Sequence, residues 1–153
     1  MKKKSYRARV IKEGHAQGPA LVSSEPISFF GGVDLDKGRI REAGHPLDGE
    51  ELAGKVLVFP TGKGSTVGSY ALYRLAKAGL APAALVMERC EPIVATGAII
   101  SAIPCVDQLD LSVFETGNLI EVRGAHVVVL DGRGESESPR GEADPITPGE
   151  DLA

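Results

Sequence analysis

Residues 55–87 read KVLVFPTGKGSTVGSYALYRLAKAGLAPAALVM. Residues 55–59 form a largely apolar run bounded by glycine and proline, which predicts a strand buried on both faces. Residues 84–87 predict a second strand of the same kind. Between them, a loop with two glycines precedes apolar residues at helical spacing, which end at Gly79. A strand, a helix and a strand of these lengths form one right-handed crossover unit, so the sequence predicts an α/β fold.

The stretches on either side of this unit predict further short elements. Strands are predicted at residues 6–11, 19–23, 26–30, 104–106, 119–123 and 126–130, and a second short helix at 93–102. Many turns separate them, since the chain contains 19 glycines and 10 prolines. Short strands at close spacing favour a small β-barrel or sandwich, with the helices packed on one side.

Composition divides the 153 residues into two parts. Residues 1–130 have the apolar content of one ordinary domain. Residues 131–153 hold seven acidic residues against two arginines and have almost no apolar side chains. Such a segment buries too little apolar surface to offset its ordering entropy, so we predict a disordered acidic tail.

Several function classes are disfavoured by composition. Charges nearly cancel in residues 1–130, so the clustered positive charge that nucleic-acid binding requires is missing. No apolar run approaches the roughly 20 residues of a membrane helix, and no signal-peptide pattern follows the lysines at 2–4. Two cysteines, Cys90 and Cys105, form neither a disulfide framework nor a CxxC pair. We therefore expect a cytoplasmic protein that carries no metal site of its own.

The loop at 60–66 is the most informative candidate site. It is not a P-loop, because the Walker A motif needs an uninterrupted Gly-Lys-Ser/Thr. Here Gly64 separates Lys63 from Ser65, and the first glycine of the motif is missing. The pattern leaves a serine flanked by glycines at the expected start of a helix.

Two roles are open for this serine. Ser65 can cap the helix, which is the more frequent role on spacing alone. Alternatively, the free amides of the helix start bind a carboxylate or phosphate, or stabilise a serine alkoxide. In that case Lys63 adds a positive charge.

Other polar residues have weaker support as site residues. His15, His45 and His126 lie in separate turns or strands without ligand-like spacing, although the first two occupy turns that can line a site. The charged residues between 88 and 91 follow a buried strand's carboxyl end, where α/β sites form. They are equally typical of a solvated surface.

Four segments share a pattern with one known family. They are PISFFGGVD at 26–34, GHPLDG at 44–49, FPTGKGSTVGSY at 59–70 and EPIVATGAIISAIP at 91–104. Together they resemble the small subunit of aconitase X. The resemblance implies a swivelling β/β/α domain, like the mobile fourth domain of aconitase.

The resemblance also implies an activity. Archaeal members dehydrate (R)-5-phosphomevalonate to trans-anhydromevalonate 5-phosphate, a step towards isoprenoids, and act only with a large subunit that carries an iron–sulfur cluster. The serine that serves as proton acceptor in the family corresponds to Ser65. Its neighbours Gly62, Lys63, Gly64 and Thr66 are then expected to bind the phosphorylated hydroxy acid, with no cofactor on this chain.

Two alternatives remain beside this hypothesis. The same family includes enzymes that act on another hydroxy acid, cis-3-hydroxy-L-proline. The chain can also be a non-catalytic subunit that shapes its partner's site, with Ser65 only a cap. A serine hydroxyl is a very weak base, so the catalytic role requires that fixed dipoles stabilise its alkoxide.

Overall fold

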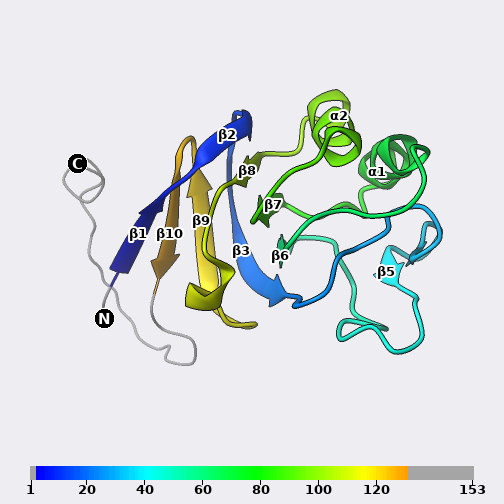
Figure 1. Cartoon of the computed structure of the whole chain (residues 1–153), viewed down its shortest axis with the longest axis horizontal. Helices are drawn as coiled ribbons and strands as arrows, with labels where there is room; N and C mark the ends of the chain where they lie inside the picture. The colour runs from blue at the N-terminus through cyan, green and yellow to red at the C-terminus, as the bar shows by residue number, and fades with distance from the viewer. Residues whose placement is uncertain (1–2, 131–153) are drawn as a thin grey trace.

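The computed structural model describes residues 3–130, which form a mixed sheet with two helices against one part of it (Figure 1). The strands are β1 (Lys3–Arg7), β2 (Arg9–Lys12), β3 (His15–Val22), β4 (Val33–Asp34), β5 (Arg39–Ile40), β6 (Val56–Phe59), β7 (Ala84–Met87), β8 (Cys105–Asp107), β9 (Leu119–Arg123) and β10 (His126–Leu130). The helices are α1 (Gly68–Lys77), α2 (Pro92–Ser101) and a 3₁₀ turn at Leu111–Val113. The predicted acidic tail, residues 131–153, lies outside the described residues.

The main sheet has eight strands in the order β1-β10-β9-β3-β6-β7-β8-β2. The four central strands from β3 to β8 run parallel, and the outer pairs are antiparallel. Although β1 and β2 stand at opposite ends of this order, only Ala8 separates them in the chain. The Ala8 amide donates to the Ala125 carbonyl (2.8 Å) at that point. The sheet therefore curls into a barrel, closed by one bent stretch of chain (Figure 1).

Strands β6 and β7 separate two hydrophobic cores. On β6, Val56 and Val58 belong to the core inside the barrel. Leu57 and Phe59 belong to the core between the sheet and the helices. Because both faces of the strand are covered, all four side chains are fully buried, as the apolar run predicts. Valine and alanine predominate in the barrel core, and leucine, isoleucine and phenylalanine in the helix-side core.

The predicted crossover unit is confirmed. Helix α1 connects the parallel strands β6 and β7, and it ends at Ala78 and Gly79, whose φ of +75° suits glycine. Helix α2 packs on α1 in the same layer. A Cβ at Gly97 would lie 2.7 Å from the Leu72 side chain, so this glycine allows the close approach of the two helices.

Three predicted strands differ from the observed ones. The predicted strand 6–11 is two strands, because the chain bends at Ala8 and each half pairs with a different neighbour. Strand β3 begins at His15 instead of residue 19. The prediction of a strand at 26–30 is wrong: only Ile27 makes a bridge, to Gly62, and a turn follows because the Gly32 amide donates to the Ser28 carbonyl.

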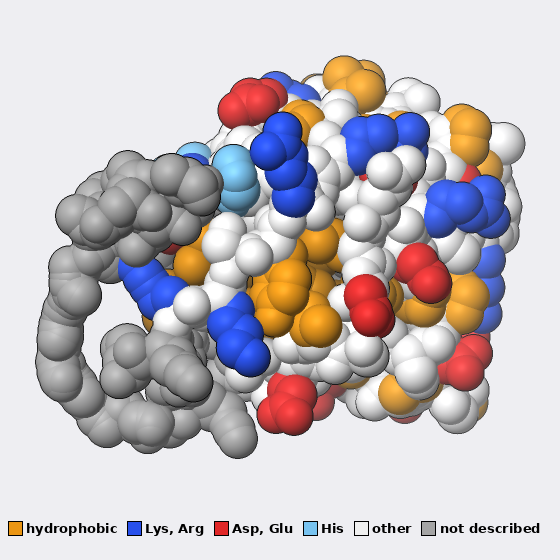
Figure 2. All heavy atoms as spheres, turned by 60° about the vertical axis from the view of Figure 1, so that its left-hand side comes forward, with side chains coloured by type: hydrophobic (Ala, Val, Ile, Leu, Met, Phe, Trp, Pro, Cys, Tyr) orange, Lys and Arg blue, Asp and Glu red, His pale blue; other side chains and the backbone are white. Residues whose placement is uncertain are grey.

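The outer surface of the barrel shows no concentration of positive charge on the face drawn in Figure 2. Basic and acidic side chains both occur there, around a group of exposed hydrophobic side chains. Within residues 3–130, no helix is long and apolar enough to cross a membrane.

Candidate functional site

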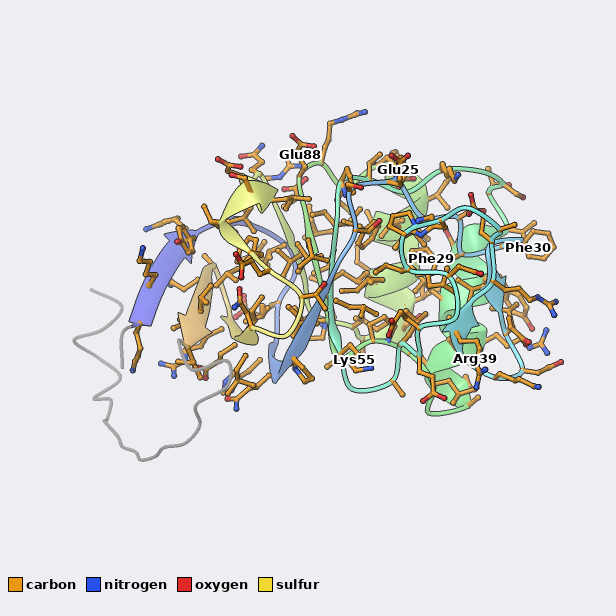
Figure 3. The ribbon with its side chains drawn as sticks, turned by 90° about the horizontal axis from the view of Figure 1, so that it is seen from below. Glu25, Phe29, Phe30, Arg39, Lys55 and Glu88 are labelled. Carbon is orange, nitrogen blue, oxygen red and sulfur yellow. The ribbon has the colours of Figure 1, made fainter. Side chains whose placement is uncertain are left out.

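The loop that carries Ser65, here called the Ser65 loop (residues 60–67), lies at the carboxyl ends of the parallel strands. It joins β6 to α1, and the Arg89 amide after β7 donates to its Pro60 carbonyl (3.0 Å). In Figure 3, Glu88 marks this edge of the sheet and Lys55, before β6, marks the opposite one. Ligands of α/β sheets bind at the carboxyl edge, so the fold puts Ser65 where a site is expected.

One side of the loop rests on residues 26–32, the support segment. The Ile27 amide donates to the Thr61 carbonyl (3.2 Å), and the Lys63 amide donates to the Ile27 carbonyl (3.0 Å). A Cβ at Gly64 would lie 2.7 Å from Ser28 Oγ, and the φ of Gly64 is +97°. Only glycine meets both conditions, so the backbone at 61–64 is fixed against the support segment.

The other side of the loop rests on the start of α2. A Cβ at Gly62 would lie 2.6 Å from Glu91 Oε1 and 2.6 Å from Val94 Cγ2. The same Glu91 carboxylate accepts hydrogen bonds from the Ile93 amide (3.0 Å) and the Val94 amide. Gly62 is therefore a packing requirement, and the loop is held between two segments.

Ser65 itself is exposed at the tip of the loop. Its Oγ accepts a hydrogen bond from the Val67 amide (3.0 Å), and its carbonyl accepts one from the Gly68 amide (2.9 Å). The helix begins only at Gly68, so the expectation that Ser65 stands directly at its start is wrong by one turn. That turn forms because the serine hydroxyl competes for a local amide. An amide that donates to Oγ also stabilises negative charge there.

Lys63 and Thr66, two other polar residues of the loop, differ in their surroundings. Lys63 Nζ makes an ion pair with Glu42 Oε2 (3.0 Å), so its charge is shared with a carboxylate. Both side chains line a pocket of about 380 Å³, together with Glu25 and His45. Thr66 is exposed, and its carbonyl accepts from the Ser69 amide (3.3 Å). The structure thus gathers all five predicted site residues on one loop.

Two of the histidines, His45 and His15, make structural contacts. His45 is buried, its Nε2 bonds the Pro26 carbonyl (3.0 Å), and its Nδ1 accepts from the Leu47 amide (3.0 Å). It therefore ties the pocket loop to the support segment. His15 begins β3 and pairs with Glu121, and His126 begins β10. The structure does not bring these two to the Ser65 loop.

Three residues at the site were missed or undervalued from the sequence. Glu42 and Ser28 contact the loop from positions far away in the chain, and no local pattern indicates them. Glu91 is predicted either at a site on the sheet edge or on a solvated surface, and the structure shows instead that it caps α2. Its position directly before Pro92, a residue favoured at the first turn of a helix, was a usable signal for a helix cap.

The described residues do not suit an iron–sulfur cluster. Residues 3–130 include no group of three or more His, Cys, Asp or Glu side chains that could hold a metal ion. Cys90 Sγ and Cys105 Sγ lie 3.8 Å apart, and hydrogen bonding to Cys90 together with burial raises the pKa of the Cys105 thiol. A cluster needs three or four thiolate ligands, and two thiols, one kept protonated, do not supply them.

Residues 5–130 match the family model described as the aconitase X swivel domain. The chain belongs to the aconitase X swivel-domain family. It is similar to two proteins named phosphomevalonate dehydratase small subunit. The protein from Methanocella arvoryzae is 53% identical over 119 residues, which cover 78% of this chain and 86% of the relative. The protein from Thermococcus gammatolerans is 47% identical over 128 residues, which cover 82% and 98%.

Solved structures confirm the predicted swivelling β/β/α fold of this aconitase X domain. The holo form of aconitase X from Thermococcus kodakaraensis is similar with a TM-score of 0.82 and 46% identity, and covers 84% of this chain and 99% of that one. The solution NMR structure of a UPF0107 protein is similar with a TM-score of 0.78 and 41% identity. The match covers 84% of this chain and 100% of that one.

Proposed function

We propose that this chain is the small subunit of a phosphomevalonate dehydratase, a hydro-lyase of the aconitase X type. The enzyme removes water from (R)-5-phosphomevalonate to give trans-anhydromevalonate 5-phosphate. Relatives of that name match this chain over most of their own length, which supports the assignment. The observation that carries the catalytic part is the exposed Ser65, on a loop fixed from two sides.

In this proposal Ser65 is the proton acceptor. The reaction removes a proton from the carbon beside the carboxylate and the hydroxyl from the next carbon, and a double bond forms between them. Ser65 Oγ takes the proton. The amide of Val67, which donates to Oγ, stabilises the alkoxide that this role needs.

The rest of the loop binds the anionic groups of the substrate. Gly62, Gly64 and Thr66 contribute backbone close to Ser65, and the packing of the two glycines against Glu91 and Ser28 holds that backbone in place. Lys63 contributes an ammonium group over the adjacent pocket. The ion pair with Glu42 must loosen or reorient when the substrate's phosphate or carboxylate arrives.

A large subunit completes the site in this proposal. The resemblance assigns to that subunit an iron–sulfur cluster, which would act as the Lewis acid on the leaving hydroxyl. This chain contributes the base, holds the substrate's anionic groups and excludes water when it closes over the site. The pair would work in the cytoplasm.

The test is Ser65→Ala in the reconstituted two-subunit enzyme. Loss of a general base lowers kcat by roughly 10² to 10⁴-fold. Loss of one local hydrogen bond lowers stability by only about 0.5–1.5 kcal/mol. Ser5 is an exposed serine on β1, so Ser5→Ala is the matched control and should leave kcat and stability unchanged. Ser69 is unsuitable because its hydroxyl links α1 to the Ile93 carbonyl (2.5 Å).

The outcomes separate the competing hypotheses. Normal turnover by Ser65→Ala would make the chain a non-catalytic subunit that shapes its partner's site. Turnover of cis-3-hydroxy-L-proline in preference to phosphomevalonate would keep the reaction class and change the substrate.

A further inference from the structure

The Glu91 side chain contacts two parts of the fold, the start of α2 and the Ser65 loop. Its carboxylate caps α2 by accepting from the Ile93 and Val94 amides. The same carboxylate lies directly against Gly62, since a Cβ there would be 2.6 Å from Oε1. The Ser65 loop and the helix start are therefore joined through one side chain.

A cap alone does not explain a glutamate at this position. Asp, Asn, Ser and Thr are the preferred caps, because their short side chains reach the amide of the second or third helical residue. Glutamate has one more methylene, which adds about 1.5 Å of reach. In this structure the longer side chain of Glu91 places Oε1 in contact with the backbone of Gly62.

The position of Gly62 matters because its backbone leads directly into Ser65 and is held by neighbouring groups on two sides. Gly62 and Gly64 both lack a side chain, so neighbouring groups must fix their backbone. Ile27 and Ser28 hold one side through the contacts described above. Glu91 and Val94 hold the other, and without the glutamate the loop can move towards α2.

We propose that Glu91 is a positioning residue for Ser65, and that the length of its side chain sets the place of the loop. This inference rests on the proposed role of Ser65 as proton acceptor. Glu91 touches no reacting atom. It acts through the backbone from Gly62 to Ser65, and a displacement of about 1 Å at a catalytic group can cost on the order of 10²-fold in rate.

The experiment compares Glu91→Asp with Glu91→Gln in the reconstituted enzyme. Aspartate keeps the cap and the charge but is too short to reach Gly62, so kcat should fall at least about tenfold with an unchanged melting temperature. Glutamine keeps the length and an acceptor oxygen, so its kcat should stay within about threefold of the parent. A normal kcat for Glu91→Asp, or equal losses in both variants, would overturn the proposal.

A second measurement is independent of activity. Amide hydrogen exchange on the free chain should become faster in Glu91→Asp at residues 62–66 and remain unchanged at Ile93 and Val94. Unchanged exchange in the loop would overturn the proposal even if kcat fell. If Ser65→Ala keeps its turnover while the loop exchange responds as expected, the role of Ser65 fails and the mechanical link through Glu91 stands.

A double-mutant cycle on Gly62 and Glu91 provides a final check, because residues in direct contact have non-additive effects on kcat. Gly62→Ala places a Cβ against Glu91 Oε1, so it should displace the loop and lower kcat by itself. In the Glu91→Asp background part of that clash is absent, and the second change should cost less than it does alone. Strictly additive effects on kcat would contradict a direct contact.

Discussion

Arg9 and Asp107 are joined by two parallel hydrogen bonds, Nε to Oδ1 (2.9 Å) and Nη2 to Oδ2 (2.8 Å). The two residues are cross-strand partners in β2 and β8, and the Asp107 side chain is fully buried. Asp107 Oδ2 also accepts from the Cys90 amide (2.8 Å). One carboxylate thus connects the barrel's closing strand to the segment that leads into α2.

Asp107→Ala should lower the free energy of unfolding by about 2 kcal/mol or more, because a buried amide loses its acceptor. Urea denaturation of the free chain measures it. Asp36→Ala is the control: it also removes an arginine partner, that of Arg74, but both groups are exposed, so its cost should be below about 1 kcal/mol. Similar losses of unfolding free energy in the two variants would contradict a structural role for the buried pair.

Glu121 predicts a pH dependence of stability. Burial alone would raise its pKa, but hydrogen bonds from His15 and Arg123 outweigh burial and leave the pKa below its usual value. A carboxyl group with a lowered pKa in the folded state contributes stability above its unfolded pKa, about 4.3. That contribution is lost as the pH falls through the lower folded pKa.

The variant Glu121→Gln should therefore flatten the fall in unfolding free energy below about pH 4.3. Glu50→Gln removes the same charge from an exposed loop and controls for net charge. Denaturant titrations at several acidic pH values provide the measurement. An unaltered pH slope in Glu121→Gln would show that the cluster on the barrel does not favour the ionised form.

Gly64→Ala should reduce both stability and turnover. The left-handed φ of +97° costs a residue with a Cβ roughly 1–2 kcal/mol, and the new Cβ would meet Ser28 Oγ. Gly49→Ala is matched to it, since its φ is +91° and nothing lies within 4 Å of the added Cβ. Both variants should lose stability through the strained φ, Gly64→Ala the more because of its clash with Ser28, but only Gly64→Ala should lose kcat. A loss of kcat in both would point to a general effect on folding.

Removal of residues 135–153 should leave the melting temperature and the turnover unchanged. The strand β10 ends at Leu130 with its pairing to β1 and β9 complete within the described residues. The family model also ends at residue 130. Size-exclusion chromatography with the large subunit is the further check, because a failure to assemble would identify the tail as a docking segment.

The sequence predicted the parts of the fold that have a local pattern. The run at 55–59, the helix that ends at Gly79 and the strand at 84–87 all follow from apolar spacing and turn residues. The bend at Ala8 does not, because the alternation of side chains continues across it and only the pairing partners change. The segment at 26–30 misled the prediction, since buried residues Ile27 and Phe29 alternate as they would in a strand.

The candidate site also has a part that a local pattern predicts and a part that it does not. Ser65, Lys63 and their glycines are adjacent in the chain, so a motif can indicate them. Figure 3 shows why their support is harder to find: Phe29 points into the core and Phe30 away from it, so the turn between them depends on tertiary packing. Glu42 and Ser28 reach the loop from other segments. No spacing rule in a single sequence places such contacts.

The pairing of β1 with β10 determines when this chain can fold. Lys3 lies opposite Leu130, so the first strand finds its neighbour only after nearly all of the described chain exists. During synthesis the βαβ unit can form early, whereas the barrel stays open until the last hairpin has left the ribosome. Contacts this distant in sequence slow folding, because loop-closure entropy is lost before any pairing compensates it. The newborn chain therefore exposes unpaired strand edges for most of its translation, and such edges are sites at which aggregation begins.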